Sequence, residues 1–362
     1  MKKIYNFSAG PSMLPFSVLN QIKKDLYNWK GLGISVMEIS HRNEHFLQLV
    51  QEIEQDLRNL LKIPSNYKIL FCQGGARGQF SAVPINLLDK FSNNPDYIES
   101  GYWSQAARIE AEKYCVPNII NIKKEHNGKK TILSPYNWKI SKKPAYIHYC
   151  PNETIDGIAI YEEPIFDNKI IVGDFSSTIL SSFINIKKYG IIYASTQKNI
   201  GISGITLVII RDDLLKKSNN VVPSILDYKI LSYHNSMFNT PSTFSWYVSG
   251  LILKWLKDMG GIKKIELINK LKSDLLYKTI DSSNLYFNDI NHLNRSNMNV
   301  TFRLLKENLT NLFEKESYNN GLHALRGHRI VGGFRASIYN AMPIEGIKEL
   351  IKFMVYFESR YG

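Results

Sequence analysis

Cysteine is scarce in this chain of 362 residues, which contains Cys72, Cys115 and Cys150 and no other. None of the three belongs to a C-x-x-C pair, and three cysteines cannot all be paired within one chain. This usage predicts a reducing, cytosolic environment and argues against a structural zinc site.

Long hydrophobic runs are also missing. The most apolar run, Ile205 to Ile210, is far too short to cross a bilayer and is better interpreted as a buried strand. The N-terminal segment is basic but has no apolar core long enough for a signal peptide. We therefore expect a soluble, cytoplasmic protein without a membrane partner.

Dense basic blocks are absent, although the net charge is +13 and the isoelectric point is about 9.3. A charge of this size is compatible with a nucleic-acid-binding protein. The basic residues are spread along the chain, which favours a drift in composition toward Lys, Asn and Ile. We expect no nucleic-acid partner, whereas a small anionic substrate would suit the positive field.

Apolar runs alternate with helical patterns through the first two thirds of the chain. The length favours two domains, and a hydrophobic content of 44% is ordinary for a globular protein. A helix is predicted over residues 44–62, and a second one, over residues 244–259, ends at Gly260 and Gly261. Strands are predicted over residues 67–72, 144–149, 169–175, 191–195 and 205–211. This order predicts an α/β domain, residues 16–260, with a mainly parallel sheet covered by helices on both faces.

The last hundred residues follow a different pattern. Apolar and polar residues alternate from Met298 to Leu304, as in a half-exposed strand. A helix over residues 309–318, a strand over 333–338 and an amphipathic helix after Pro343 follow. We expect a smaller α+β domain made of residues 261–362 together with residues 1–15.

Polar side chains follow three of the predicted strands. They are Gln73 to Arg77, Asp174 with Ser176 and Ser177, and Ser195 to Lys198. Ligands of open α/β sheets bind beyond the carboxyl ends of the strands, so these segments should line one crevice. The Gly74-Gly75 turn opens a helix whose N–H groups favour an anion, although glycine turns often serve only tight packing.

Lys198 and Asp174 together indicate a function that neither residue indicates alone. Alone, Asp174 could cap a helix, Lys198 could be a surface lysine, and Trp103 could be a core aromatic residue. Together, a lysine amine can form a Schiff base with an aldehyde cofactor, and an aspartate can keep a pyridine nitrogen protonated. The pair therefore favours chemistry of the pyridoxal-phosphate kind.

Ordered motifs carry a family resemblance. They are FSAGPSMLP, SVMEISHR, LFCQGGARGQF, GYWS, HYCPNETIDGIAI, DFSSTILS, ASTQKNIG, PSILDY, SMFNTP and GHRIVGGFRASIYNAMP. From residue 4 to the C-terminus the chain resembles the bacterial phosphoserine aminotransferase family. These are homodimeric class-V aminotransferases of fold type I, which implies a seven-stranded sheet, pyridoxal 5′-phosphate as cofactor, and active sites shared between two subunits.

The resemblance implies a role for each matching residue. Lys198 matches the Schiff-base lysine, Asp174 the partner of the pyridine nitrogen, and Trp103 the residue stacked on the ring. The remaining cofactor contacts match Thr154, Ala76, Arg77 and Gln197, with Asn239 and Thr240 reaching the phosphate from the other subunit. Ala76 stands where relatives often have glycine, and a backbone N–H contact would survive that change.

The substrate side follows from the same resemblance. Arg335 matches the arginine that binds the α-carboxylate, as a guanidinium fork suits a carboxylate. His328 and Arg329, with His41 and Arg42 from the other subunit, match the site for the phosphate or the distal carboxylate. Each His-Arg pair alone would be read as a solvated turn. Ala9 stands where some relatives have serine, so one hydroxyl contact to glutamate is expected to be missing.

The implied reaction converts 3-phosphooxypyruvate and L-glutamate into O-phospho-L-serine and 2-oxoglutarate in L-serine biosynthesis. The family also handles the 4-phosphohydroxythreonine pair in pyridoxine biosynthesis. Two alternatives stay open: another fold-type I enzyme, such as a serine–pyruvate or alanine–glyoxylate aminotransferase, and a basic nucleic-acid-binding protein.

Overall fold

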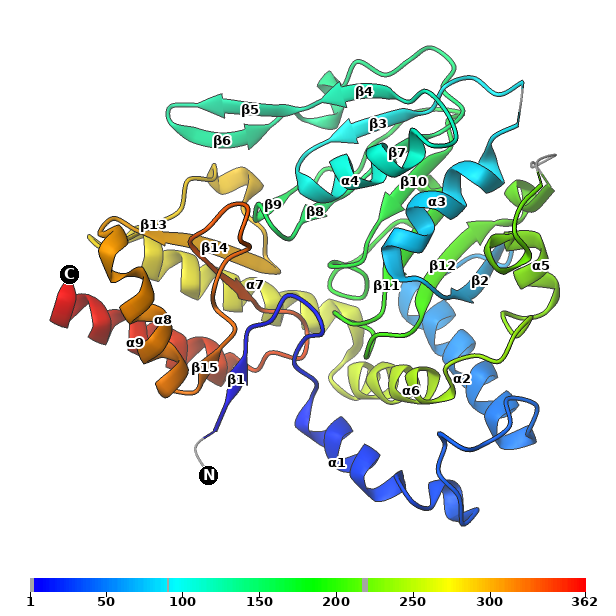
Figure 1. The fold of residues 1–362 in the computed structure, drawn as a ribbon, viewed down its shortest axis with the longest axis horizontal. Helices are drawn as coiled ribbons and strands as arrows, with labels where there is room; N and C mark the ends of the chain where they lie inside the picture. Colours follow the sequence, from blue (N-terminus) through cyan, green and yellow to red (C-terminus); the bar gives the residue numbers. More distant parts are fainter. Residues whose placement is uncertain (1–2, 90, 217–220) are drawn as a thin grey trace.

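A seven-stranded sheet forms the centre of the larger part of the molecule (Figure 1). The computed structural model describes residues 3–89, 91–216 and 221–362. The strands, in spatial order, are β2 (Tyr67–Cys72), β12 (Thr206–Arg211), β11 (Ile191–Ser195), β10 (Ile171–Asp174), β7 (Ile147–Tyr149), β3 (Asp96–Glu99) and β4 (Asn118–Asn121). Strand β12 runs antiparallel to both neighbours and every other pair is parallel, which confirms the predicted mainly parallel sheet.

Both faces of this sheet are covered, as the continuous apolar runs predict. In β12, Leu207 and Ile209 belong to one hydrophobic cluster, whereas Val208 and Ile210 belong to another. The first face packs against α1 (Phe16–Asp25), α2 (Glu44–Leu61) and α6 (Thr243–Asp258). The second packs against α3 (Gly75–Leu87), α4 (Tyr102–Ala111) and α5 (Tyr228–Tyr233). Side-chain alternation along each strand thus fixes which helices lie on which face.

The C-terminal part lies beside the sheet and is coloured yellow to red in Figure 1. Its elements are β13 (Tyr286–Phe287), β14 (Asn299–Leu304), α8 (Thr310–Asn319), β15 (Leu322–His323), β16 (Phe334–Ser337) and α9 (Ile344–Tyr361). Strands β13, β14 and β16 form an antiparallel sheet, and β1 (Tyr5–Asn6) pairs in parallel with β15. Tyr5 and Asn6 therefore pair with a strand of the C-terminal part.

Helix α7 (Gly261–Asp281) joins the two parts and was not predicted. Gly260 adopts a left-handed conformation with φ of 94°, so the two glycines turn the chain directly into the next helix. Ile265 packs in the core of the larger part, whereas Leu276 and Ile280 pack in the core of the smaller part. The division at residue 260 remains a prediction, and residues 1–2, 90 and 217–220 of the two expected domains lie outside the described residues.

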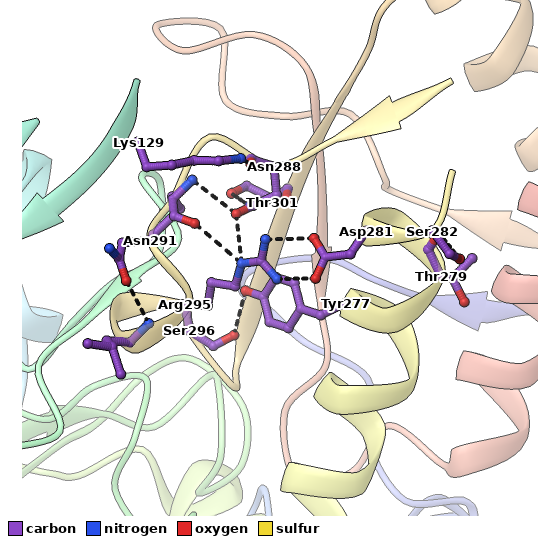
Figure 2. A network of polar contacts seen from close by, with 12 residues as sticks. Lys129, Tyr277, Thr279, Asp281, Ser282, Asn288, Asn291, Arg295, Ser296 and Thr301 are labelled. Carbon is purple, nitrogen blue, oxygen red and sulfur yellow. Dashed lines mark hydrogen bonds and ion pairs between the residues drawn. The ribbon is translucent and has the colours of Figure 1, made fainter. Parts of the chain in front are cut away.

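A hairpin forms a second connection between the two parts. Strands β5 (Lys123–His126) and β6 (Lys129–Ile132) extend from the large sheet toward β13 (Figure 1). Lys129 Nζ donates to the carbonyl of Asn288 at 2.6 Å. Figure 2 shows this contact beside Arg295, whose guanidinium group forms two hydrogen bonds to Asp281, at 2.6 and 2.7 Å. Within residues 3–89, 91–216 and 221–362, we find no helix with the length and apolarity needed to traverse a bilayer.

Candidate active site

The three polar segments that follow strands β2, β10 and β11 meet at one edge of the sheet. The N–H of Ala76 donates to Ser195 Oγ at 2.7 Å, and the N–H of Ser195 donates to Ser176 Oγ at 3.0 Å. Ser195 thereby links the start of helix α3 to the segment after β10. The predicted convergence of the strand ends is confirmed, although the N–H of Ala76 already has a partner inside the protein.

Asp174 ends β10 and is buried, with 5% of the residue exposed. The N–H of Ser176 donates to Asp174 Oδ1 at 3.0 Å. Burial raises the pKa of Asp174, while the Ser176 hydrogen bond and the charge of Lys198 act in the opposite direction. A buried carboxylate of this kind is best satisfied by a cationic partner, and a protonated pyridine nitrogen would be one.

Trp103 lies at the centre of the residues predicted to contact the cofactor. Lys198 Nζ lies 5.9 Å from the centre of its ring, and the guanidinium carbon of Arg77 lies at 5.5 Å. The indole Nε1–H donates to Thr154 Oγ1 at 2.8 Å. Four predicted cofactor residues from four separate segments therefore surround one space, where a flat anionic cofactor would find an aromatic face and two cations.

Arg335 connects this space to the predicted substrate side. Its Nη1 donates to the carbonyl of Thr154 at 2.9 Å, and burial lowers its pKa. Burial also lowers the pKa of His328, together with the charges of Arg335 and Arg329, while Asp156 raises it. Three groups predicted to bind anions thus lie close enough to repel one another, which an anionic ligand would relieve.

Four of the predicted site residues are not brought to this cluster. His41 and Arg42 lie on the loop before α2, and Asn239 and Thr240 lie on the loop between α5 and α6. Within residues 3–89, 91–216 and 221–362, no hydrogen bond or ion pair links them to the residues around Lys198. Arg42, Asn239 and Thr240 are exposed, and His41 is partly exposed.

Comparisons with known proteins give the fold and the site a family. The profile of the family described as "Aminotransferase class-V" matches residues 4–350. A phosphoserine aminotransferase from Buchnera aphidicola subsp. Schizaphis graminum is 62% identical over 362 residues, covering 100% of both chains. The chain belongs to the class-V aminotransferase family.

Solved structures agree with this assignment. The phosphoserine aminotransferase from Bacillus circulans subsp. alkalophilus is 36% identical, with a TM-score of 0.95 and 99% of both chains covered. A phosphoserine aminotransferase studied for radiation damage of its Schiff base is 38% identical, with a TM-score of 0.95, covering 99% of this chain and 100% of that one. The chain is therefore an aminotransferase with the expected fold, and its family implies pyridoxal phosphate.

The N-terminal segment lies against Lys198, and its contact through Ser12 was not predicted. Ser12 Oγ donates to the carbonyl of Lys198 at 2.7 Å, and the N–H of Ser12 donates to the carbonyl of Gln197 at 3.0 Å. The hydroxyl group of Tyr339 donates to the carbonyl of Ala9 at 2.8 Å. Ala9 thus contributes a backbone contact, which its side chain does not affect.

Lys272 stabilises the turn that carries Tyr339. It is completely buried, and its Nζ donates to the carbonyls of Ile338, Tyr339 and Met342 at 2.9, 2.8 and 3.0 Å. Burial lowers the pKa of Lys272 to about 7. The lysine holds the turn that presents Tyr339 to the N-terminal segment. Lys272 was not singled out from the sequence, and its place among the buried residues of α7 is the signal that could have indicated this role.

Proposed function

We propose that this aminotransferase transfers the amino group of L-glutamate to 3-phosphooxypyruvate, giving O-phospho-L-serine and 2-oxoglutarate in L-serine biosynthesis. The observation that carries the proposal is that Arg329 and Arg335 lie close to His328, in a cluster that begins next to Thr154 and Trp103. The full-length relatives, which are phosphoserine aminotransferases, support the same substrate.

The residues around Lys198 suit pyridoxal phosphate. When bound, this cofactor supplies an aldehyde that holds amino groups covalently and a ring that withdraws electrons from the substrate α-carbon. In our proposal Lys198 would hold the aldehyde, and its Nζ would take up the α-proton as a general base and return a proton as a general acid. Asp174 would keep the ring nitrogen protonated, and Trp103 would pack against the ring.

Contacts to the cofactor phosphate are assigned to the start of helix α3. A helix N-terminus favours an anion, and Ala76 and Arg77 lie in the first turn of α3. Gln197 precedes Lys198 and would bind the same group. The Ser195 hydroxyl that accepts the N–H of Ala76 marks where a phosphate oxygen could compete for this donor.

Two anionic ends define the substrate. Arg335 is half-buried and is assigned to the α-carboxylate, which glutamate and phosphoserine share. His328 and Arg329 are assigned to the distal anion, which is a γ-carboxylate in one substrate and a phosphate in the other. Because 3-hydroxy-2-oxo-4-phosphooxybutanoate also carries an α-carboxylate and a distal phosphate, we propose it as a further substrate, in pyridoxine biosynthesis.

Arg329 provides the test of substrate choice. We expect Arg329→Ala to weaken the reaction with phosphoserine about 10- to 100-fold, because a charge-assisted hydrogen bond to the phosphate is lost. The reaction with serine or alanine should hardly change. The rates are measured from the change in cofactor absorbance after each amino acid is mixed with the enzyme.

Arg326→Ala is the matched control. Arg326 lies three residues earlier, is exposed, and forms an ion pair with Glu314 at 2.9 Å. It should leave both reactions unchanged. An equal loss with phosphoserine and serine in Arg329→Ala would favour an alanine–glyoxylate or serine–pyruvate enzyme instead, as would wild-type protein that reacts only with serine or alanine.

A homodimer with shared sites is the second part of the proposal. The exposed loops that carry Arg42 and Asn239 would complete the site of the other subunit. Large apolar residues on α1, after α1 and at the end of α5 are exposed in the single chain: Phe16 by 75%, Tyr27 by 83% and Tyr233 by 83%. Exposed apolar side chains of this size favour burial in an interface.

Mixing two impaired variants tests the shared site in the reaction with phosphoserine. We expect Lys198→Ala and Arg42→Ala dimers, unfolded and refolded together, to regain about a quarter of the wild-type activity. The hybrid dimer has one intact site, which combines Lys198 of one subunit with Arg42 of the partner subunit. Each variant refolded alone is the control. If Arg42 served its own subunit, the mixture would regain nothing.

A further inference from the structure

Helix α4, which carries Trp103, begins on a buried carboxylate. Glu153 is completely buried at the end of β8 (Asn152–Glu153), which pairs with β9 (Ile158–Ala159). Its Oε2 accepts the N–H of Trp103 at 2.7 Å, and its Oε1 accepts the N–H of Ser104 at 2.9 Å. Ser100 Oγ donates to Oε1 at 3.2 Å. One side chain from a distant segment therefore binds three donors around the start of this helix.

The contact is more specific than a simple helix cap. The first N–H groups of a helix have no partner within the helix, and a negative charge there is favourable. Each oxygen of Glu153 binds a different one of two consecutive N–H groups, so the plane of the carboxylate and the first turn fix each other. Only an ionised carboxylate offers two oxygens free of hydrogen for such donors.

The backbone at Gly101 lies too close to Glu153 and Asp156 for a side chain to fit. A Cβ atom on Gly101 would lie 2.5 Å from Asp156 Oδ2 and 2.6 Å from Glu153 Cγ. Asp156 accepts the N–H of Tyr102 at 3.1 Å. The hairpin thus binds three successive N–H groups of α4, and the glycine before Tyr102 and Trp103 is required by this close approach.

We propose that Glu153 is a positioning residue, whose carboxylate fixes the backbone of Trp103 and thereby the angle at which the indole packs on the cofactor ring. Thr154, the next residue, binds the far end of the same indole at Nε1. Backbone and ring of Trp103 are therefore held by two adjacent residues of one hairpin. This inference rests on the proposed function, in which Trp103 contacts pyridoxal phosphate.

Glu153→Gln tests the inference. The amide keeps the volume but places an NH2 group against a backbone N–H, so the start of α4 should shift. We expect the dissociation constant for pyridoxal phosphate, titrated into the cofactor-free protein, to rise about tenfold. The visible circular dichroism signal per molecule of bound cofactor should decrease. Burial and the neighbouring Asp156 raise the pKa of Glu153 to about 7, so both are measured above that pH.

Glu163→Gln is the matched control, because Glu163 lies on the same stretch of chain and forms a surface ion pair with Lys188 at 2.8 Å. It should leave both readouts unchanged. A double-mutant cycle with Trp103→Ala separates positioning from general loosening. If Glu153 acts through Trp103, Glu153→Gln should add little once the indole is gone.

Fully additive effects on cofactor affinity, or unchanged dichroism in Glu153→Gln, would overturn the inference. Should Glu153→Gln fail to fold, the same cycle is run with Glu153→Asp, which keeps the charge but draws the oxygens away from the helix. The inference rests only on the cofactor part of the proposed function, and failure of that part has a different signature, since the wild-type protein would then not bind pyridoxal phosphate at all.

Discussion

Lys198→Ala is expected to reduce amino-group transfer about 10⁴-fold or more, which is the largest effect of any single change in this chain. In the proposed reaction Lys198 has two tasks, covalent attachment of the cofactor and transfer of the α-proton. Alanine removes both. The overall structure should persist, because Lys198 is only partly buried and the hydrogen bond from Ser12 reaches its backbone carbonyl, which alanine retains.

Borohydride trapping is the measurement. Treated wild-type protein should keep its cofactor through denaturation, on one proteolytic peptide that contains Lys198, whereas Lys198→Ala should lose it. Lys188→Ala, which breaks a surface ion pair with Glu163, is the control and should keep the label. A label on another lysine would remove Lys198 from its assigned role. Colourless protein with salt-steep binding to DNA or RNA would instead support the nucleic-acid alternative.

The large sheet and the placement of Asp174 and Lys198 could be predicted because their signals are local. Each strand is a short apolar run, and the polar residues that follow it mark its carboxyl end. Since β10 and β11 are parallel, Asp174 and Ser195 had to finish at the same edge. The periodicity of α9 and the alternation in β14 likewise depend on neighbouring residues alone.

The features that were not predicted depend on contacts between distant segments, which the sequence pattern does not encode. Strands β5 and β6 are largely exposed and lack alternation, so nothing indicated the hairpin. Glu153 lies about fifty positions from the helix that it binds, and Tyr339 lies far along the chain from Ala9. Such hydrogen bonds are decided by tertiary packing. The roles of four residues on loops stay predictions, since these loops are largely exposed in one chain; the residues are His41, Arg42, Asn239 and Thr240.

Asp174→Asn carries the second largest expected effect. We expect the rate to fall on the order of 10³-fold, because a neutral amide no longer keeps the pyridine nitrogen protonated. The cofactor should still attach to Lys198. Stability should not fall, since burial already raises the pKa of Asp174 and an amide is less costly to bury than a carboxylate. Single-turnover rates with phosphoserine and the midpoint of urea unfolding are the two measurements.

This combination separates the proposed role from the alternative that Asp174 only caps the segment after β10. Asparagine caps a chain as well as aspartate does, and its side-chain oxygen can still accept the N–H of Ser176. A capping role therefore predicts an unchanged rate in Asp174→Asn. Asp167→Asn, at an exposed position on the loop before β10, is the control for loss of one negative charge. A fall in rate confined to Asp174→Asn, with equal or higher stability, is expected only if the buried charge acts on the cofactor ring.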